Sequence, residues 1–142
     1  MPTSKASARW EGGLKSGRGE FNAGSGSFSG EYSFPTRFEG KPGTNPEELI
    51  AAAHAACFSM ALSANLEKAG TPAQLISTTA HCTLDVGADG ARITKMRLVV
   101  QGRVPETDPA AFADAANKAK EGCPVSKALK GNVEFELEAT LE

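Results

Sequence analysis

The sequence predicts an α+β fold in a single domain, residues 1–142. Three observations predict it: short strand patterns before residue 45, one long uncharged helix pattern after it, and a cleanly alternating strand pattern at the carboxyl end. Strand and helix patterns are segregated along the chain rather than alternating as β-α-β units, which favours α+β over α/β. A chain of this length buries a core without disulfides or a structural metal.

The composition argues against several classes of protein. The net charge is −2 and no Lys/Arg cluster is present, so we expect no nucleic-acid partner. The first ten residues lack the apolar stretch of a secretory signal, so we expect a cytoplasmic protein. In that reducing compartment three cysteines do not indicate a disulfide framework, and any that matter are catalytic or redox-active.

The amino-terminal third is rich in glycine, and no run before residue 45 is expected to hold a helix. Segments 7–11, 19–22 and 30–34 lie between Gly/Ser turns and predict short strands. Asn45 then predicts a helix start as N-cap, with Pro46 at the first helical position and Glu48 completing a capping box. This helix is expected to run to Ala69 and to end at Gly70.

Residues 49–66 of this helix carry no charged side chain, which is the length of a marginal membrane span. Alanines and four polar residues keep its hydropathy weak, so we expect no membrane and a helix surrounded by protein. A chain this small can hardly cover every face of such a helix. The pattern therefore suggests a partner subunit.

After Gly70 the sequence predicts a hairpin, two helices and a final strand. Residues 76–86 have mostly apolar even positions, Val86 included, and a turn over 87–90 leads to a return strand whose apolar residues are Met96, Leu98, Val100 and Val104. Asp108 and Pro109 begin a helix that ends at Gly122 and presents one apolar face: Phe112, Ala115, Ala116 and Ala119. A short helix then runs to about Leu129. The last strand directs five apolar residues inward and its glutamates outward: Val133, Phe135, Leu137, Ala139 and Leu141 against Glu134, Glu136, Glu138 and Glu142.

The three cysteines have different settings. Cys82 shares the apolar side of its strand and is predicted to be a core residue. Cys123 stands at the start of the short helix, where backbone N–H groups favour a thiolate, although it could serve only as a cap. Cys57 lies too deep in its helix for the dipole to act, so it is a core residue unless a cation such as arginine is supplied.

No CxxC motif is present, so thioredoxin-type exchange is not indicated. Two separated cysteines instead fit a mechanism in which one thiol is oxidised to sulfenic acid and the other condenses with it. His54 and Cys57 share a helical face, but no third ligand stands at metal-site spacing, so we expect no metal and no cofactor. His81 lies on the polar side of its strand and is expected to be solvated.

Two long motifs surround the two cysteines. They are Thr36–Gly40 with Gly43–Ile50 and Ala52–Met60, and Lys118–Ser126. Both resemble the osmotically inducible protein C (OsmC) family, and the resemblance extends over essentially the whole chain. The Thr-Arg-Phe-Glu-Gly segment resembles OsmC proper more closely than the sister organic hydroperoxide resistance (Ohr) branch.

The resemblance implies a thiol peroxidase of the oxidative and osmotic stress response, which reduces organic hydroperoxides and, less well, hydrogen peroxide. It implies that Cys57 is the peroxidatic cysteine, Cys123 the resolving cysteine, Arg37 the activating arginine and Glu47 its partner. It also implies a Cys57–Cys123 disulfide that a cellular dithiol reduces, of the lipoyl type in Ohr relatives. The implied fold is an intertwined homodimer, with antiparallel sheets wrapped around two long central helices.

Three points stay open at this stage. Glu47 precedes Cys57 by ten residues, about 15 Å along a helix, so either Arg37 spans most of that gap or the partner subunit contributes to the site; we favour the second. Ohr proteins have their arginine near the amino terminus, where this chain has Lys15 and Arg18, so Arg18 is a second candidate. The glycine-rich context of Arg37 is expected to let it swing in and out. The alternative function is a non-catalytic redox-responsive or small-apolar-ligand-binding protein of the same fold.

Overall fold

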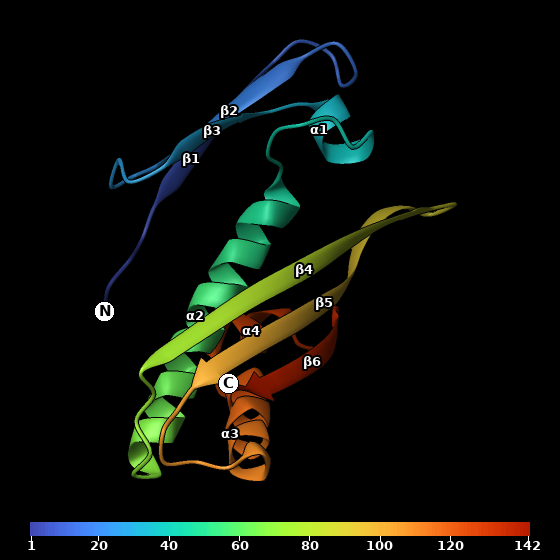
Figure 1. Cartoon of the computed structure of the whole chain (residues 1–142). Helices are drawn as coiled ribbons and strands as arrows, with labels where there is room; N and C mark the ends of the chain where they lie inside the picture. Colours follow the sequence, from blue (N-terminus) through green and yellow to red (C-terminus); the bar gives the residue numbers. More distant parts are fainter. The chain divides into compact units, whose positions relative to one another are not determined.

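The computed structural model describes residues 1–142, which divide into two compact units, residues 1–49 and 50–142. The first unit contains an antiparallel sheet in the order β1-β2-β3, formed by β1 (Ala6–Glu11), β2 (Arg18–Ala23) and β3 (Ser29–Tyr32). The three strands predicted from the Gly/Ser spacing are therefore confirmed. The α+β class is confirmed as well, with two separate sheets in the chain (Figure 1).

A short helix, α1 (Phe34–Phe38), follows β3 and corrects the prediction that no helix precedes residue 45. It begins at a capping box: the Thr36 backbone N–H donates to Ser33 Oγ at 3.4 Å, and the Ser33 backbone N–H donates to Thr36 Oγ1 at 2.9 Å. Because the helix has only five residues, it is too short to show a helical period in the sequence. The capping residues Ser33 and Thr36 were the only sequence feature that indicated this helix.

The long helix α2 (Pro46–Lys68) begins in the first unit and continues through the second. Asn45 is its N-cap, as predicted, and its Oδ1 accepts the Glu48 backbone N–H at 2.8 Å. The predicted capping box is wrong, because the Glu48 carboxylate instead accepts the Thr44 hydroxyl at 2.7 Å. After Lys68 the chain turns at Gly70, whose φ of 81° is favourable for glycine.

By length and composition alone, α2 is apolar enough to cross a membrane, with a mean hydropathy of 1.5 over 18 residues. The core helix of a soluble protein passes the same test. In this structure one face of α2 is buried in the core of the second unit, through Phe58, Leu62 and Leu66. The opposite face is uncovered, and Met60 is 76% exposed there.

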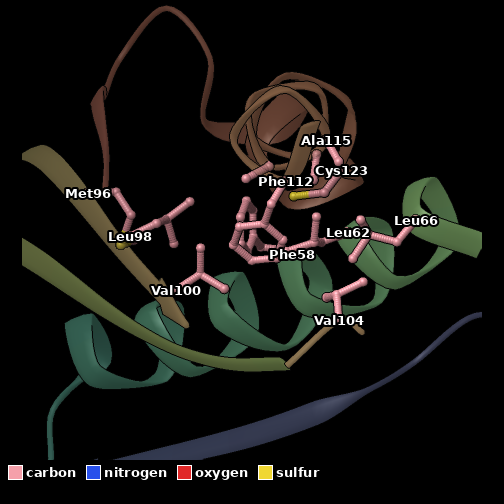
Figure 2. Close-up of a cluster of buried hydrophobic side chains, with 12 residues drawn as sticks. Phe58, Leu62, Leu66, Met96, Leu98, Val100, Val104, Phe112, Ala115 and Cys123 are labelled. Atoms are coloured by element: carbon pink, nitrogen blue, oxygen red, sulfur yellow. The ribbon is translucent and has the colours of Figure 1, made fainter. Parts of the chain in front are cut away.

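The second unit packs α2, α3 (Pro109–Gly122) and α4 (Pro124–Leu129) with a sheet in the order β4-β5-β6. Its strands are β4 (Leu75–Gly87), β5 (Gly90–Arg103) and β6 (Glu134–Leu141). Figure 2 shows the core, where side chains of α2 and α3 meet those of β5: Phe58, Leu62, Leu66, Met96, Leu98, Val100 and Phe112. Cys82 packs against this cluster, as predicted.

The prediction of purely antiparallel sheets is wrong for the second sheet, because β6 pairs with β5 in parallel. The connection through α3 and α4 is long enough to return the chain to the same end of the sheet. On the outer face of this parallel pair, ion pairs link Lys95 to Glu136, Arg97 to Glu138 and Arg103 to Glu142. Val86 continues the apolar side of β4 but is exposed, because it lies next to the turn at the tip of the hairpin.

Candidate active site

The side chains of Cys57 and Cys123 are in contact within the second unit, although 66 residues separate them in the sequence. The Cys123 thiol and the Val125 backbone N–H both interact with the sulfur of Cys57. Cys57 is partly exposed on α2, whereas Cys123 is fully buried between α3 and α4. The structure thus brings together the two cysteines that the resemblance singled out, both as thiols.

Cys123 is the N-cap of α4, which confirms the prediction made from Pro124. Its Sγ accepts the Ser126 backbone N–H at 3.3 Å, and Ser126 Oγ lies 3.1 Å from the same sulfur. The core side chains of α3 surround this position, and Figure 2 shows Cys123 in the same cluster as Phe112 and Ala115. One face of the thiol pair is therefore sealed by the core.

Burial raises the pKa of the Cys57 thiol, and the adjacent Cys123 raises it further, while the Val125 N–H acts in the opposite direction. No arginine or lysine contributes to this balance. Because a cysteine reacts as its thiolate, a nucleophilic role for Cys57 would require a cation from outside the second unit.

Arg37 and Glu47 form a two-pronged ion pair in the first unit. Arg37 Nε donates to both carboxylate oxygens at 3.1 and 3.3 Å, and Nη2 donates to Oε1 at 2.7 Å. Glu47 is only 5% exposed, so the guanidinium is the partner that compensates a buried carboxylate. Arg37 lies in the last turn of the short helix α1, and the swinging motion expected of its side chain stays a prediction.

The two predicted pairs thus stand in different units: Arg37 with Glu47 in residues 1–49, and Cys57 with Cys123 in residues 50–142. Beside Arg37, the first unit has a hollow of about 230 Å3 that the sequence did not indicate. Aromatic and aliphatic side chains form most of its wall: Trp10, Leu14, Tyr32, Phe34 and Phe38, with Ser33 and Arg37. Such a wall suits an apolar group held beside a guanidinium.

Arg18, the alternative arginine, has different surroundings. Its side chain is 82% exposed and lies 3.8 Å from Glu11. It lines a polar hollow together with Arg9, Glu20 and Glu31. Lys15 instead lies over the ring of Phe34, with 5.7 Å from Nζ to the ring centroid.

His54 and Ser126 lie beside the two cysteines, and their contact was not indicated by the sequence. His54 is fully buried, and its Nε2 lies 2.7 Å from Ser126 Oγ, which in turn contacts Cys123. The two residues are 72 positions apart, so no short-range pattern could have linked them. No group of three or more His, Cys, Asp or Glu residues is placed to hold a metal ion.

We expect the free energy of unfolding to fall as the pH drops below about 6.5, because burial lowers the pKa of His54 from that ordinary value. Between the lowered pKa and 6.5, the unfolded chain binds a proton that the folded chain does not, so stability rises with pH in this window. The slope from this residue is at most about 1.4 kcal/mol per pH unit. Urea unfolding at about pH 5.5 and about pH 7.5 measures it.

The matched control for this prediction is His54→Gln, which keeps a hydrogen-bonding group but does not titrate. In that variant the slope between the two pH values should be smaller than in the wild type. An unchanged slope would show that other groups cause the dependence. The exposed His81 is present in both proteins and cancels in the comparison.

Comparisons with known proteins agree with the fold and with the two motifs. The family model described as OsmC-like protein matches residues 38–138. The chain is 48% identical over 135 residues to peroxiredoxin OsmC of Escherichia coli strain K12, with 94% of each chain covered.

Two solved structures are also similar to this chain. The crystal structure of the organic hydroperoxide resistance protein OhrB of Bacillus subtilis superposes with a TM-score of 0.78 and 31% identity, over 97% of this chain and 98% of that one. An organic hydroperoxide resistance protein from Elizabethkingia anophelis gives a TM-score of 0.81 and 26% identity, over 100% of this chain and 98% of that one.

Proposed function

The chain belongs to the OsmC family, and from this membership we propose that it is a cysteine-based peroxidase that reduces organic hydroperoxides. The observation that carries the proposal is the contact between the Cys57 and Cys123 thiols. A pair of thiols in contact, one partly exposed and one buried, suits an oxidation at the first followed by condensation with the second. The similar proteins named for peroxide reduction or hydroperoxide resistance support the same chemistry.

In the proposed first step, the thiolate of Cys57 attacks the distal oxygen of the hydroperoxide. The O–O bond breaks, the alcohol leaves with a proton, and Cys57 becomes a sulfenic acid. Arg37 stabilises the thiolate and orients the peroxide oxygen. Glu47 engages Nε and Nη2 of Arg37, which leaves the Nη1 edge of the guanidinium for the reactants.

The apolar wall of the hollow beside Arg37 supports the choice of an organic hydroperoxide as substrate. Trp10 and the aromatic rings of α1 would hold the alkyl or aryl group while the guanidinium holds the peroxide end. Hydrogen peroxide has no apolar group to occupy this wall. We therefore propose that it is reduced less efficiently.

We further propose that the working form is an intertwined homodimer with a composite site. The uncovered apolar face of α2 supports this, because a contiguous row of exposed apolar residues is typical of a surface that another protein covers. The row follows the helical period: Ala52, Ala53, Ala56, Met60 and Ala64. A second copy covering this face would place two α2 helices at the centre and bring an Arg37–Glu47 pair to the thiols.

In the proposed second step, Cys123 attacks the sulfur of the Cys57 sulfenic acid, a disulfide forms and water leaves. A cellular dithiol then reduces the disulfide by thiol–disulfide exchange and restores both thiols. A reductant of the lipoyl type fits this cycle, since its second thiol displaces the protein thiol and forms a disulfide within the reductant. The whole chain, residues 1–142, acts as one domain in this scheme.

Cys123→Ser is expected to complete one oxidation of Cys57 and then to stop. Without the second thiol, the sulfenic acid persists and excess peroxide carries it to the sulfinic acid. Intact-protein mass spectrometry after one equivalent of cumene hydroperoxide measures this, and dimedone labelling identifies the modified residue. The wild type should instead lose two hydrogens as its disulfide forms.

Two results would overturn the proposed function. One is a wild type that neither consumes cumene hydroperoxide nor changes mass. The other is a Cys123→Ser protein that recycles with the dithiol at the wild-type rate, since the resolving role of Cys123 would then be wrong.

A further inference from the structure

The second unit contains one fully buried histidine whose presence the proposed peroxidase cycle does not explain. His54 is 0% exposed and lies among apolar residues, with the Phe135 ring in edge contact at a centroid distance of 5.4 Å. Its Nδ1 has no hydrogen-bond partner. A buried polar atom without a partner lowers the stability of the fold, so the residue is a poor choice for a purely structural role.

The other ring nitrogen of His54 is at the start of an unbroken chain of contacts toward the thiols. Nε2 lies 2.7 Å from Ser126 Oγ, and Ser126 Oγ lies 3.1 Å from Cys123 Sγ. The thiol of Cys123 in turn interacts with that of Cys57. Every member from His54 to Cys123 is at most 1% exposed, so bulk water does not compete for the proton along this path.

A proton relay along this chain requires that the lone pair of the neutral His54 ring is at Nε2, the nitrogen beside Ser126 Oγ. Burial lowers the pKa of His54, so the imidazole is neutral near pH 7 and one ring nitrogen keeps a lone pair. With that lone pair at Nε2, the Ser126 hydroxyl donates to Nε2 and the Cys123 thiol donates to Ser126 Oγ. The Ser126 backbone N–H already donates to the Cys123 sulfur and stabilises negative charge there.

No charged side chain faces His54 from the elements around it. From α4 it meets Ser126, and through it the thiol of Cys123. From β6 it meets Phe135, whose neighbour Glu136 is paired with Lys95 on the other face of the strand. On its own helix the nearest titratable group is Cys57, three residues ahead.

We propose that His54 and Ser126 form a proton relay that activates Cys123 for the condensation step; this inference rests on the proposed peroxidase function. The S–H bond of Cys123 breaks as its sulfur bonds to the sulfur of Cys57, and the S–O bond of the sulfenic acid breaks. The sulfenic sulfur is reduced and Cys123 is oxidised, both to the disulfide level. The proton of Cys123 passes through Ser126 to His54 Nε2; the hydroxide that leaves Cys57 takes one proton from solvent to form water, and His54 then returns its proton to solvent, so the net products are the disulfide and one water.

Ser126 touches the reacting thiol, whereas His54 acts through Ser126 and is a positioning residue that also holds the proton. The test is single-turnover oxidation of the dithiol form with one equivalent of cumene hydroperoxide. Rapid quenching with dimedone follows the sulfenic acid of Cys57, and mass spectrometry follows the disulfide. The two steps are thereby separated in the same sample.

His54→Gln keeps a group that hydrogen-bonds to Ser126 but cannot take up a proton. We expect its condensation step to be about 100-fold slower than in the wild type, relative to the first step in the same protein. Its rate should also rise about tenfold per pH unit, because the thiolate must then form without the relay. The wild type should show a much flatter dependence near neutral pH.

Ser126→Ala removes the bridge itself and should give the same defect, and it keeps the proposal testable where His54→Gln folds poorly. The double variant should be no slower than either single variant, because both changes break one path. His81→Gln, which changes the exposed histidine, serves as the matched control and should match the wild type in both steps.

The outcomes separate the relay from the proposed function. If the wild type forms no sulfenic acid at Cys57, the proposed function fails at its first step and the relay fails with it. If the sulfenic acid forms and condenses equally fast, with the same pH profile, in the wild type, His54→Gln and Ser126→Ala, then the relay alone is wrong. Slowing in both variants with an unchanged pH profile would also overturn it, since only a structural role would remain.

Discussion

Replacing Cys57 by serine is expected to abolish alkyl hydroperoxide reduction, with a loss of at least about 1000-fold in kcat/KM. A serine hydroxyl is not ionised near neutral pH and does not accept an oxygen atom from a peroxide, so the first step has no nucleophile. Serine differs from cysteine by one atom, and Cys57 is partly exposed, so the fold should be retained. Consumption of tert-butyl hydroperoxide in the presence of a dithiol measures the loss.

The third cysteine provides the matched control for this experiment. Cys82 packs against the core from β4 and belongs to neither of the pairs described above, so Cys82→Ser should reduce the hydroperoxide at the wild-type rate. Equal turnover by Cys57→Ser and the wild type would contradict the peroxidase proposal. If Cys82→Ser loses turnover while Cys57→Ser stays active, the reactive thiol is Cys82 and the assignment to Cys57 is wrong.

Replacing Arg37 by methionine is expected to lower kcat/KM for alkyl hydroperoxides by about 100- to 1000-fold, because one preorganised cationic donor is lost. The proposed first step requires this cation, since burial raises the pKa of the Cys57 thiol and no arginine or lysine contributes in the opposite direction. A rising dependence of the residual rate on pH should accompany the loss. Steady-state kinetics over a range of pH values measures both.

Two further variants show whether the effect comes from Arg37 itself. Arg37→Lys keeps a positive charge beside the buried Glu47 carboxylate, so the fold is maintained while the two-pronged contact is lost. It should be intermediate between the wild type and Arg37→Met. Arg18→Met removes an exposed arginine paired only loosely with Glu11 and should retain full activity. A large loss in Arg18→Met with an active Arg37→Met would reverse the assignment.

Most elements of the fold could be predicted because their signals are local. Asn45, Asp108 and Cys123 each cap the helix that their sequence position predicts, and the alternation of β6 identifies its buried face. The helix α1 was missed since five residues show no period. Val86 is exposed although it continues the alternation, because it lies beside the turn at the tip of the hairpin, beyond the part of β4 that packs on the core.

The direction of β6 could not be predicted from its alternation. Parallel strands are usually covered on both faces and read as continuous apolar runs, whereas β6 alternates with glutamates. The glutamates on the outer face of β6 pair with Lys95 and Arg97 of β5. This parallel strand therefore alternates between apolar and charged residues, as antiparallel strands commonly do. The long segment between Arg103 and Glu134 was the better indication, since a parallel pair needs a crossover.

The candidate site was predictable only in part, because its members are far apart in the sequence. Local rules favoured Cys123 over Cys57, and only the family motif identified both. The contact of His54 with Ser126 depends on packing α4 against α2, which no local pattern encodes. The same holds for the aromatic hollow beside Arg37, whose walls come from β1, β3 and α1.

The glutamates of β6 also have a consequence for the protein at high concentration. As the outermost strand of its sheet, β6 has one row of backbone N–H and C=O groups without a neighbouring strand, which is where a foreign strand could add and start a fibre. A second copy of β6 would bring Glu134, Glu136 and Glu138 against their own kind, and like charges at that spacing repel. The side chains that stabilise the sheet from within thus also protect its open edge against aggregation.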